Sequence, residues 1–127
     1  MSRLLTLTAV IEAATGVGLL IIPSTVVVML LATPLETTAT MTLGRIAGAA
    51  LLALAIACWL ARDETQSHGG REMVVAMIFY NFGAVLILGA AGIGSQPVGF
   101  ALWPAVALHA VMVVWCGVSL TNADRTR

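Results

Sequence analysis

The chain consists of four long apolar segments separated by short polar or turn-forming stretches. Each segment can cross the roughly 30 Å hydrocarbon core of a bilayer, because an α-helix rises about 1.5 Å per residue. The segment limits predict membrane-spanning helices over about residues 4–22, 38–61, 72–94 and 100–121. The pattern therefore predicts an all-α, four-helix transmembrane bundle that forms a single integral membrane domain over residues 1–127.

The stretch after the first apolar segment is apolar but too short to span a membrane. Pro23 bends or ends the first helix, because proline lacks a backbone N–H and clashes with the preceding turn. The residues that follow, STVVVMLLAT, lead directly to Pro34. We expect a short interfacial or half-inserted segment here. A kinked continuation of the first helix to Leu31 is the alternative, since membrane helices tolerate proline.

The arginines indicate how the bundle is oriented. The chain has no lysine, and with four spans most of its arginines fall on one side of the membrane, namely Arg3, Arg62, Arg71, Arg125 and Arg127. The two connections on the opposite side carry none. Because basic residues accumulate in cytoplasmic segments, we expect both termini and the 62–72 loop to lie in the cytoplasm, with the protein in a bacterial inner membrane.

Composition supports the membrane class and excludes others. Hydrophobic residues make up 60% of the chain and charged residues only 9%, whereas soluble domains carry roughly 25% charged residues. The formal net charge is zero and no basic stripe is present, which excludes nucleic acid as a partner and leaves membrane lipids. Cys58 and Cys116 lie in apolar segments without metal-ligand spacing and are interpreted as packing residues rather than as a disulfide or a metal site.

Each apolar segment carries a polar or ionisable group that is costly inside a bilayer. These groups are Glu12, Arg45, Tyr80, Asn81 and His109. An ionisable side chain at that depth costs about 2.5 to 3.5 kcal/mol on insertion scales, so it faces a protein interior or a wet cavity. On the first segment, helical periodicity places one further set of polar and small residues on the face of Glu12, namely Thr8, Thr15 and Gly16.

Counting residues from the cytoplasmic end of each span estimates the depth of these groups. Glu12 lies about 12 Å deep, and Tyr80 and Asn81 about 14 Å. His109 lies about 19 Å deep and Arg45 about 24 Å. The count predicts a ladder of polar groups, in which the groups of each helix lie at a different depth, rather than a ring at one depth. A direct Glu12–Arg45 contact is strained at this separation, so a network bridged through His109 and Asn81, or through water, is favoured.

Two interpretations of this polar set remain open. The residues could form a binding or proton-relay site, or they could only stabilise the packing of the helices by hydrogen bonds between them. Hydrogen bonds between membrane helices contribute about 0.6 to 2 kcal/mol each without any ligand. His109 is not favoured as a haem or metal ligand, because no second His, Met or Cys stands at ligand spacing. No nucleophile elbow, phosphate loop or carboxylate pair is present, so the sequence does not decide whether the chain is an enzyme and favours a non-enzymatic role.

Small residues on the second span indicate close helix packing. Gly44-x-x-x-Gly48 has the spacing that lets another helix approach closely. Packing within the chain is favoured over a dimer seam.

Four motifs together resemble the DoxX-like and related small four-helix bacterial inner-membrane proteins: E-A-A-T-G-V-G-L-L-I-I-P, L-G-R-I-A-G-A-A-L-L-A-L-A, Y-N and L-W-P-A-V-A-L-H. The resemblance implies a four-helix bundle and, in some relatives, a link to redox or quinone-associated membrane systems. Its polar signature corresponds here to Glu12, Pro23, Arg45, Tyr80, Asn81 and His109. Small multidrug transporters also place a glutamate in their first helix, but their tryptophan-glycine pattern in helix 3 is absent.

The first functional hypothesis is an intramembrane site for a small polar or amphipathic ligand such as a quinone headgroup. Arg45 would hold an anionic or carbonyl group of the ligand. Glu12 and His109 would exchange protons, and Tyr80 and Asn81 would orient the ligand. The quinone would be the only cofactor, and no metal is expected.

Two other functions are carried as alternatives. The protein could be an accessory or assembly subunit of a larger membrane complex, with Gly44, Gly48 and the glycines of the third span as its contact face. It could also be a small transporter or channel, which would require a homo-oligomer because four short helices enclose little lumen.

Overall fold

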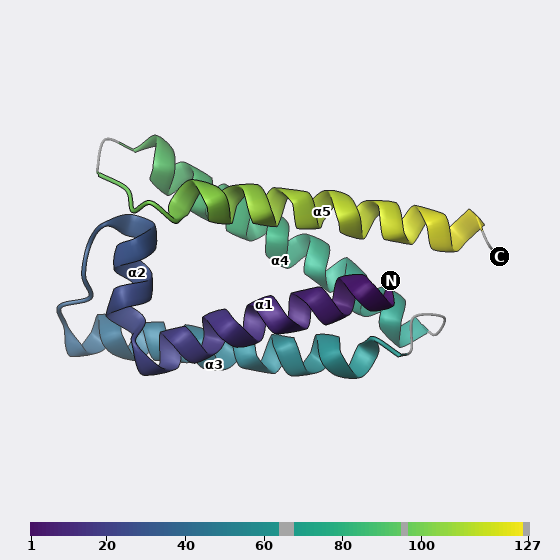
Figure 1. Cartoon of the computed structure of the whole chain (residues 1–127), viewed down its shortest axis with the longest axis horizontal. Coiled ribbons are helices and arrows are strands. Elements are labelled where there is room, and N and C mark those ends of the chain that lie inside the picture. The colour runs from purple at the N-terminus through teal and green to yellow at the C-terminus, as the bar shows by residue number, and fades with distance from the viewer. Residues whose placement is uncertain (64–67, 95–96, 126–127) are drawn as a thin grey trace.

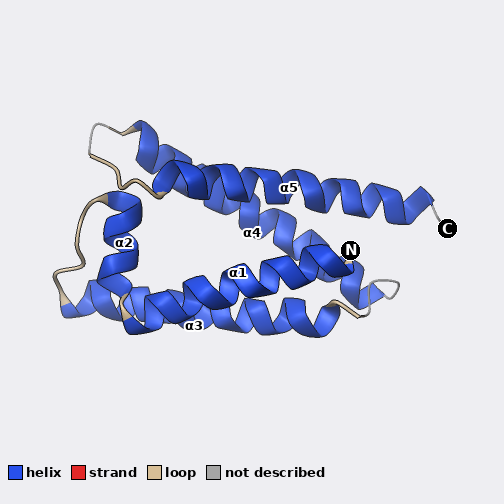
Figure 2. Cartoon of the chain, in the orientation of Figure 1, coloured by secondary structure: helices blue, strands red, loops and turns tan. Residues whose placement is uncertain are grey.

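The computed structural model describes residues 1–63, 68–94 and 97–125. The described residues form five helices and no strand (Figures 1 and 2), namely α1 (Ser2–Ile21), α2 (Pro23–Leu31), α3 (Thr38–Ala61), α4 (His68–Ile93) and α5 (Leu102–Arg125). Of these, α1, α3, α4 and α5 are long and apolar enough to cross a membrane. The prediction of an all-α chain with four candidate spans and a short segment after the first is confirmed. The chain is a small multi-pass membrane protein.

Two helices extend beyond the predicted limits of their spans. The predicted third span begins near residue 72, whereas α4 begins at His68. The predicted fourth span ends near residue 121, whereas α5 continues to Arg125. Both additions are polar turns, because hydropathy marks the part of a helix that is apolar and not the point at which its backbone hydrogen bonds end.

The short segment after α1 is a separate helix. Ile22 has φ −131° and ψ 55°, so the helical backbone is interrupted before Pro23 begins α2. Proline suits this first helical position, where its missing N–H has no intrahelical partner. α2 ends at Leu31 and is capped by Ala32, which adopts a left-handed conformation with φ 52°. The alternative of a kinked but continuous first helix is therefore not what the chain forms.

The four long helices form two pairs, α1 with α3 and α4 with α5 (Figure 1). Glycines set the approach of the first pair. A Cβ placed on Gly16 would lie 2.8 Å from the carbonyl oxygen of Gly48, and one on Gly48 would lie 2.7 Å from that of Gly16. Gly44 faces Pro23 and Leu35, where a Cβ would lie 3.1 Å from each side chain. The Gly44-x-x-x-Gly48 pattern is thus occupied by contacts within the chain.

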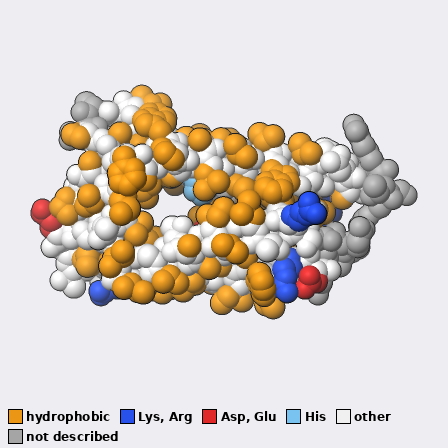
Figure 3. All heavy atoms as spheres, viewed as in Figure 1, with side chains coloured by type: hydrophobic (Ala, Val, Ile, Leu, Met, Phe, Trp, Pro, Cys, Tyr) orange, Lys and Arg blue, Asp and Glu red, His pale blue; other side chains and the backbone are white. Residues whose placement is uncertain are grey.

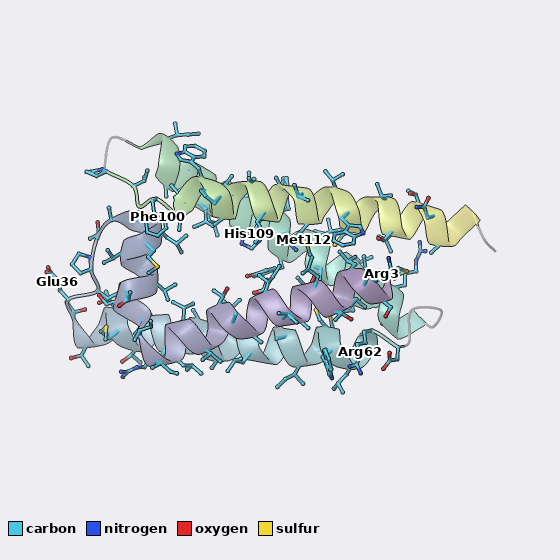
Figure 4. The ribbon with its side chains drawn as sticks, viewed as in Figure 1. Arg3, Glu36, Arg62, Phe100, His109 and Met112 are labelled. Atoms are coloured by element: carbon cyan, nitrogen blue, oxygen red, sulfur yellow. The ribbon has the colours of Figure 1, made fainter. Side chains whose placement is uncertain are left out.

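The two pairs meet at the end where α1 and α4 begin and α3 and α5 end (Figure 1). An apolar cluster joins all four helices there, made of Leu4, Leu5, Ala9, Cys58, Val74, Met77, Met112 and Cys116. Arg3 and Arg62 also lie at this end, and Glu36 lies at the opposite one (Figure 4). We call the first the arginine end.

At the opposite end, α2 connects the two pairs through main-chain atoms. The N–H of Gly99 donates to the carbonyl of Leu30 (3.0 Å), and the N–H of Ala101 donates to that of Met29 (2.9 Å). A Cβ on Gly99 would collide with the carbonyl of Met29. The segment before α5 therefore lies directly on the end of α2, and glycine is required for this approach.

The sides of the molecule are apolar, as contact with lipid requires (Figure 3). Large side chains such as Phe79, Ile87 and Ile93 are 75%, 72% and 82% exposed. A soluble protein rarely exposes so much contiguous apolar surface, whereas hydrocarbon solvates it directly.

Candidate functional site

Four of the five polar residues singled out in the sequence lie together. Glu12 comes from α1, Tyr80 and Asn81 from α4, and His109 from α5. The Tyr80 hydroxyl donates to Glu12 Oε2 (3.1 Å), and Nδ1 of His109 lies 2.8 Å from Oδ1 of Asn81. The Tyr80 and His109 rings meet edge to face, with centroids 5.7 Å apart and planes at 78°. These contacts form one connected polar cluster across three helices.

The polar cluster continues the helix faces that build the apolar cluster at the arginine end. Met77 precedes Asn81 by four residues on α4, and Met112 follows His109 by three on α5, so each pair shares a helix face. Glu12 extends the buried face of α1 in the same way. The folding of the apolar core therefore brings the polar groups together one or two turns further along each helix.

Two residues of the cluster are deeply buried, and Tyr80 and His109 are half-buried. Glu12 is 4% exposed and Asn81 is 2% exposed. The Asn81 amide nitrogen donates to the carbonyl of Met77 one turn earlier (2.7 Å), so the side chain is held at both of its polar atoms. A buried polar group with every partner in place is rigid, which makes Asn81 a support for the His109 ring.

A cavity of about 220 Å³ lies beside the cluster, between the two helix pairs and next to α2. Its polar lining comes from Glu12, Thr15, Tyr80 and His109. The remaining wall is apolar and comes from α1, α2, α4, α5 and the residue before α5, namely Ile11, Val26, Met29, Leu30, Leu88, Ala101, Ala105 and Leu108. Figure 3 shows the molecule hollowed between the pairs, and in Figure 4 His109 points from α5 into this space.

The structure does not bring Arg45 to the cluster, and the expected coupling to Glu12 is not formed. Arg45 is exposed on α3 and makes no hydrogen bond or ion pair with any residue that the structure describes. The inward face of α3 is built instead from small residues, Gly48, Ala55 and Cys58. Because side chains lean toward their helix N-terminus, a long arginine near the start of α3 can extend its charged head to the water interface.

The predicted ladder is also corrected. Depth counting separates Asn81 from His109 by about 5 Å, yet their side chains are in hydrogen-bond contact. The count treats every helix as perpendicular to the membrane and aligned at one plane, and it ignores tilt and axial shift. Cross-helix contacts are set by packing, which depth alone does not contain.

Sequence reasoning missed two parts of the site. The wall contributed by α2 was not predicted, because α2 is held by main-chain hydrogen bonds that leave no side-chain signal. Thr15 was placed on the face of Glu12 but was given no role, although it lines the cavity. Thr8, one turn from Glu12, is 2% exposed and its hydroxyl has no partner among the described residues.

The described residues contain no group of three or more His, Cys, Asp or Glu that could hold a metal ion. Cys58 and Cys116 are free thiols in the apolar cluster. Their packing role in this cluster is a direct consequence of their burial.

No protein-family model, characterised protein or solved structure matches this chain. The resemblance to DoxX-like proteins has no support from these comparisons.

Proposed function

We propose that this membrane protein binds a small polar or amphipathic ligand inside the membrane, in the cavity between its two helix pairs. The observation that carries the proposal is that three of the four residues of the polar cluster, Glu12, Tyr80 and His109, line a cavity. Polar residues that only hold helices together need no cavity beside them, because hydrogen bonds between helices stabilise best where the surrounding atoms fill the interface.

The energetic cost of Glu12 supports the same conclusion. A membrane-buried carboxyl group is expensive, and here the only side-chain hydrogen bond it receives among the described residues comes from Tyr80. One such bond contributes about 0.6 to 2 kcal/mol, which is less than the insertion cost. Replacing buried ionic groups by apolar residues is often stabilising, so a functional use explains the residue better than stability does.

The size of the cavity limits the polar head of the ligand. An engineered apolar cavity of about 150 Å³ holds a benzene molecule, so a volume of about 220 Å³ accommodates one substituted ring. The apolar wall from α2 can receive the beginning of a hydrocarbon tail. A quinone-type headgroup has this size and shape.

The proposed roles follow from contact with the cavity. Glu12 and His109 line it and would exchange protons with the ligand. Tyr80 orients the ligand and holds Glu12. Asn81 does not line the cavity and is a positioning residue for His109. Arg45, exposed on α3, has no part in the site.

Mass spectrometry of the protein, extracted gently from its own membrane, tests the proposal. The unsubstituted protein should retain a specific small molecule, and Glu12→Gln should lose it because the group that faces the cavity is changed. Glu36→Gln is the matched control, since Glu36 is an exposed acid in the connection before α3. Equal retention by the Glu12→Gln and Glu36→Gln proteins, with intact helix content, would refute the site.

We further propose that the arginine end is cytoplasmic, in a bacterial inner membrane. The arginine bias supports this orientation. A membrane-impermeant maleimide added to intact cells should label a Glu36→Cys protein and leave a Ser2→Cys protein unlabelled, because both positions are exposed at opposite ends. The unsubstituted protein is the control, since both of its cysteines are fully buried. The reverse labelling pattern would invert the orientation.

A second candidate function, an accessory subunit of a larger complex, is favoured by a separate observation. Gly44 and Gly48 are occupied within the chain, but a Cβ on Gly83 or Gly89 of α4 would meet nothing within 4 Å. Such positions allow a partner helix to approach closely. If this function holds, Gly83→Leu should release a protein that otherwise copurifies in stoichiometric amount. Purification without such a protein would refute the accessory-subunit function.

A further inference from the structure

The hydrogen-bond partners of Asn81 determine which way its amide points. The carbonyl of Met77 can only accept, so the side-chain atom that lies 2.7 Å from it is the donating Nδ2. The opposite assignment would place two acceptors against each other. The other amide atom, Oδ1, therefore faces His109, and Oδ1 can only accept.

This orientation determines the tautomer of His109. Because Oδ1 of Asn81 accepts, the His109 nitrogen that lies 2.8 Å away must donate, so Nδ1 carries the proton. In the neutral imidazole Nε2 is then an acceptor. Nε2 makes no hydrogen bond with a described residue, and the one fully enclosed, unpartnered side-chain polar atom of the described chain is Thr8 Oγ1. The Nε2 lone pair is therefore accessible from the cavity that His109 lines.

The two hydroxyl groups of the cavity lining donate their hydrogen bonds to acceptors within the protein. The Tyr80 hydroxyl gives its proton to Glu12 Oε2, and the Thr15 hydroxyl gives its proton to the carbonyl of Ile11 (3.0 Å). Glu12 keeps Oε1, which has no partner among the described residues and accepts when the carboxyl group is ionised. With Glu12 ionised, every polar side chain around the cavity thus presents lone pairs to it and no proton.

We infer that the cavity selects a ligand whose head donates hydrogen bonds, a neutral hydroxyl-bearing ring rather than its carbonyl counterpart. The inference rests on the proposed function and adds the chemical class of the ligand. A hydroxyl on the ring can donate to His109 Nε2 or to Glu12 Oε1. A carbonyl in the same place directs its lone pairs at those of the protein. His109 Nε2 and Glu12 Oε1 then have no hydrogen-bond donor.

The selectivity follows from the asymmetry of buried hydrogen bonds. Leaving a buried polar group without its partner costs about 1 to 3 kcal/mol, far more than the net gain of an average bond. One unmade bond of this kind weakens binding about fivefold to more than a hundredfold. A site built to receive hydroxyl groups therefore rejects an analogue of equal size that lacks them.

The unique tyrosine makes the inference measurable. Tyr80 is the single tyrosine of the chain, so protein labelled with fluorotyrosine gives one ¹⁹F resonance, from a side chain on the cavity. Three probes of similar shape are titrated anaerobically into the whole protein in lipid nanodiscs: tetramethylhydroquinone, tetramethylbenzoquinone and the dimethyl ether of the hydroquinone. The hydroquinone should shift the resonance at a concentration at least about fivefold lower than either of the others.

Two variants assign the effect to the cavity. Ala105 lines the cavity, so Ala105→Phe should abolish the shift by filling it. Ala107→Phe, which adds the same ring to an exposed position of α5, should leave the shift intact. Glu12→Gln should bind the hydroquinone more weakly than the unsubstituted protein does, which is why ligand is lost on extraction. Because it presents an amide donor in place of a carboxylate acceptor, its preference for the hydroquinone over the other two probes should also narrow.

Each outcome has a defined meaning. Equal or tighter binding of the quinone or of the ether, still blocked by Ala105→Phe, would overturn the inference and leave the proposed function standing. An unchanged preference in Glu12→Gln would overturn it as well. If no probe shifts the resonance, or if Ala105→Phe shifts as the unsubstituted protein does, the cavity does not bind such rings and the proposed function fails with the inference.

Discussion

Gly48→Ala tests how the α1–α3 pair is held together. The new Cβ would lie 2.7 Å from the carbonyl oxygen of Gly16 and 3.0 Å from Cβ of Leu19. Ordinary contact begins at about 3.4 Å, so the two backbones must separate by about 0.7 Å where they are closest. Neither contact involves the free end of a flexible side chain, so the strain cannot be relieved by a rotamer change.

The expected cost is about 1 to 3 kcal/mol, the usual range for overpacking an interior. Alanine favours the helix over glycine by about 1 kcal/mol, so the net loss of stability should be about 0 to 2 kcal/mol. Gly83→Ala separates the two effects, because a Cβ there meets nothing within 4 Å. It should be neutral to stabilising by about 1 kcal/mol.

Reversible unfolding in mixed micelles of increasing SDS content, followed by circular dichroism, measures both variants against the unsubstituted protein. The decisive quantity is the difference between Gly48→Ala and Gly83→Ala, since the helix propensity gain cancels. That difference should be about 1 to 3 kcal/mol. If the two variants unfold at the same SDS fraction, the close approach of Gly16 and Gly48 does not hold the pair and the packing argument fails.

Three further outcomes are expected. Asn81→Ala leaves His109 Nδ1 and the Met77 carbonyl without their partner and should cost about 1 to 3 kcal/mol in the same unfolding assay; stability within 0.5 kcal/mol of the unsubstituted protein would contradict it. Thr8→Val removes a buried hydroxyl that has no partner among the described residues, so stability should rise by about 1 kcal/mol. A loss instead would reveal a partner for that hydroxyl. Arg45→Gln should leave ligand retention in mass spectrometry unchanged, because Arg45 is exposed away from the cavity. Loss of the ligand would show that Arg45 belongs to the site.

The architecture was accessible from the sequence because its determinants are local. The length of each apolar segment sets the span. The interruption of the helix before Pro23 follows from the ring of this proline and from its missing N–H. Depth counting placed Glu12 and Tyr80 at similar levels, and the structure joins them by a hydrogen bond.

The rest of the site depends on information that the sequence pattern does not hold. Arg45 shares a helix with Gly48, and only the packing of Gly48 on Gly16 shows which face of α3 turns inward. The contact of Asn81 with His109 depends on the axial shift between α4 and α5. The wall that α2 adds to the cavity depends on main-chain bonds, which any sequence in α2 could make.

That last feature has an evolutionary consequence. The joint between α2 and the segment before α5 uses the carbonyls of Met29 and Leu30, and its one side-chain requirement is that residue 99 be glycine. The side chains of Met29, Leu30 and Val26 meanwhile line the cavity. Substitution can therefore reshape that wall without loosening the scaffold. The side chains that could change to fit a new ligand are thus distinct from the main-chain atoms that join α2 to the segment before α5.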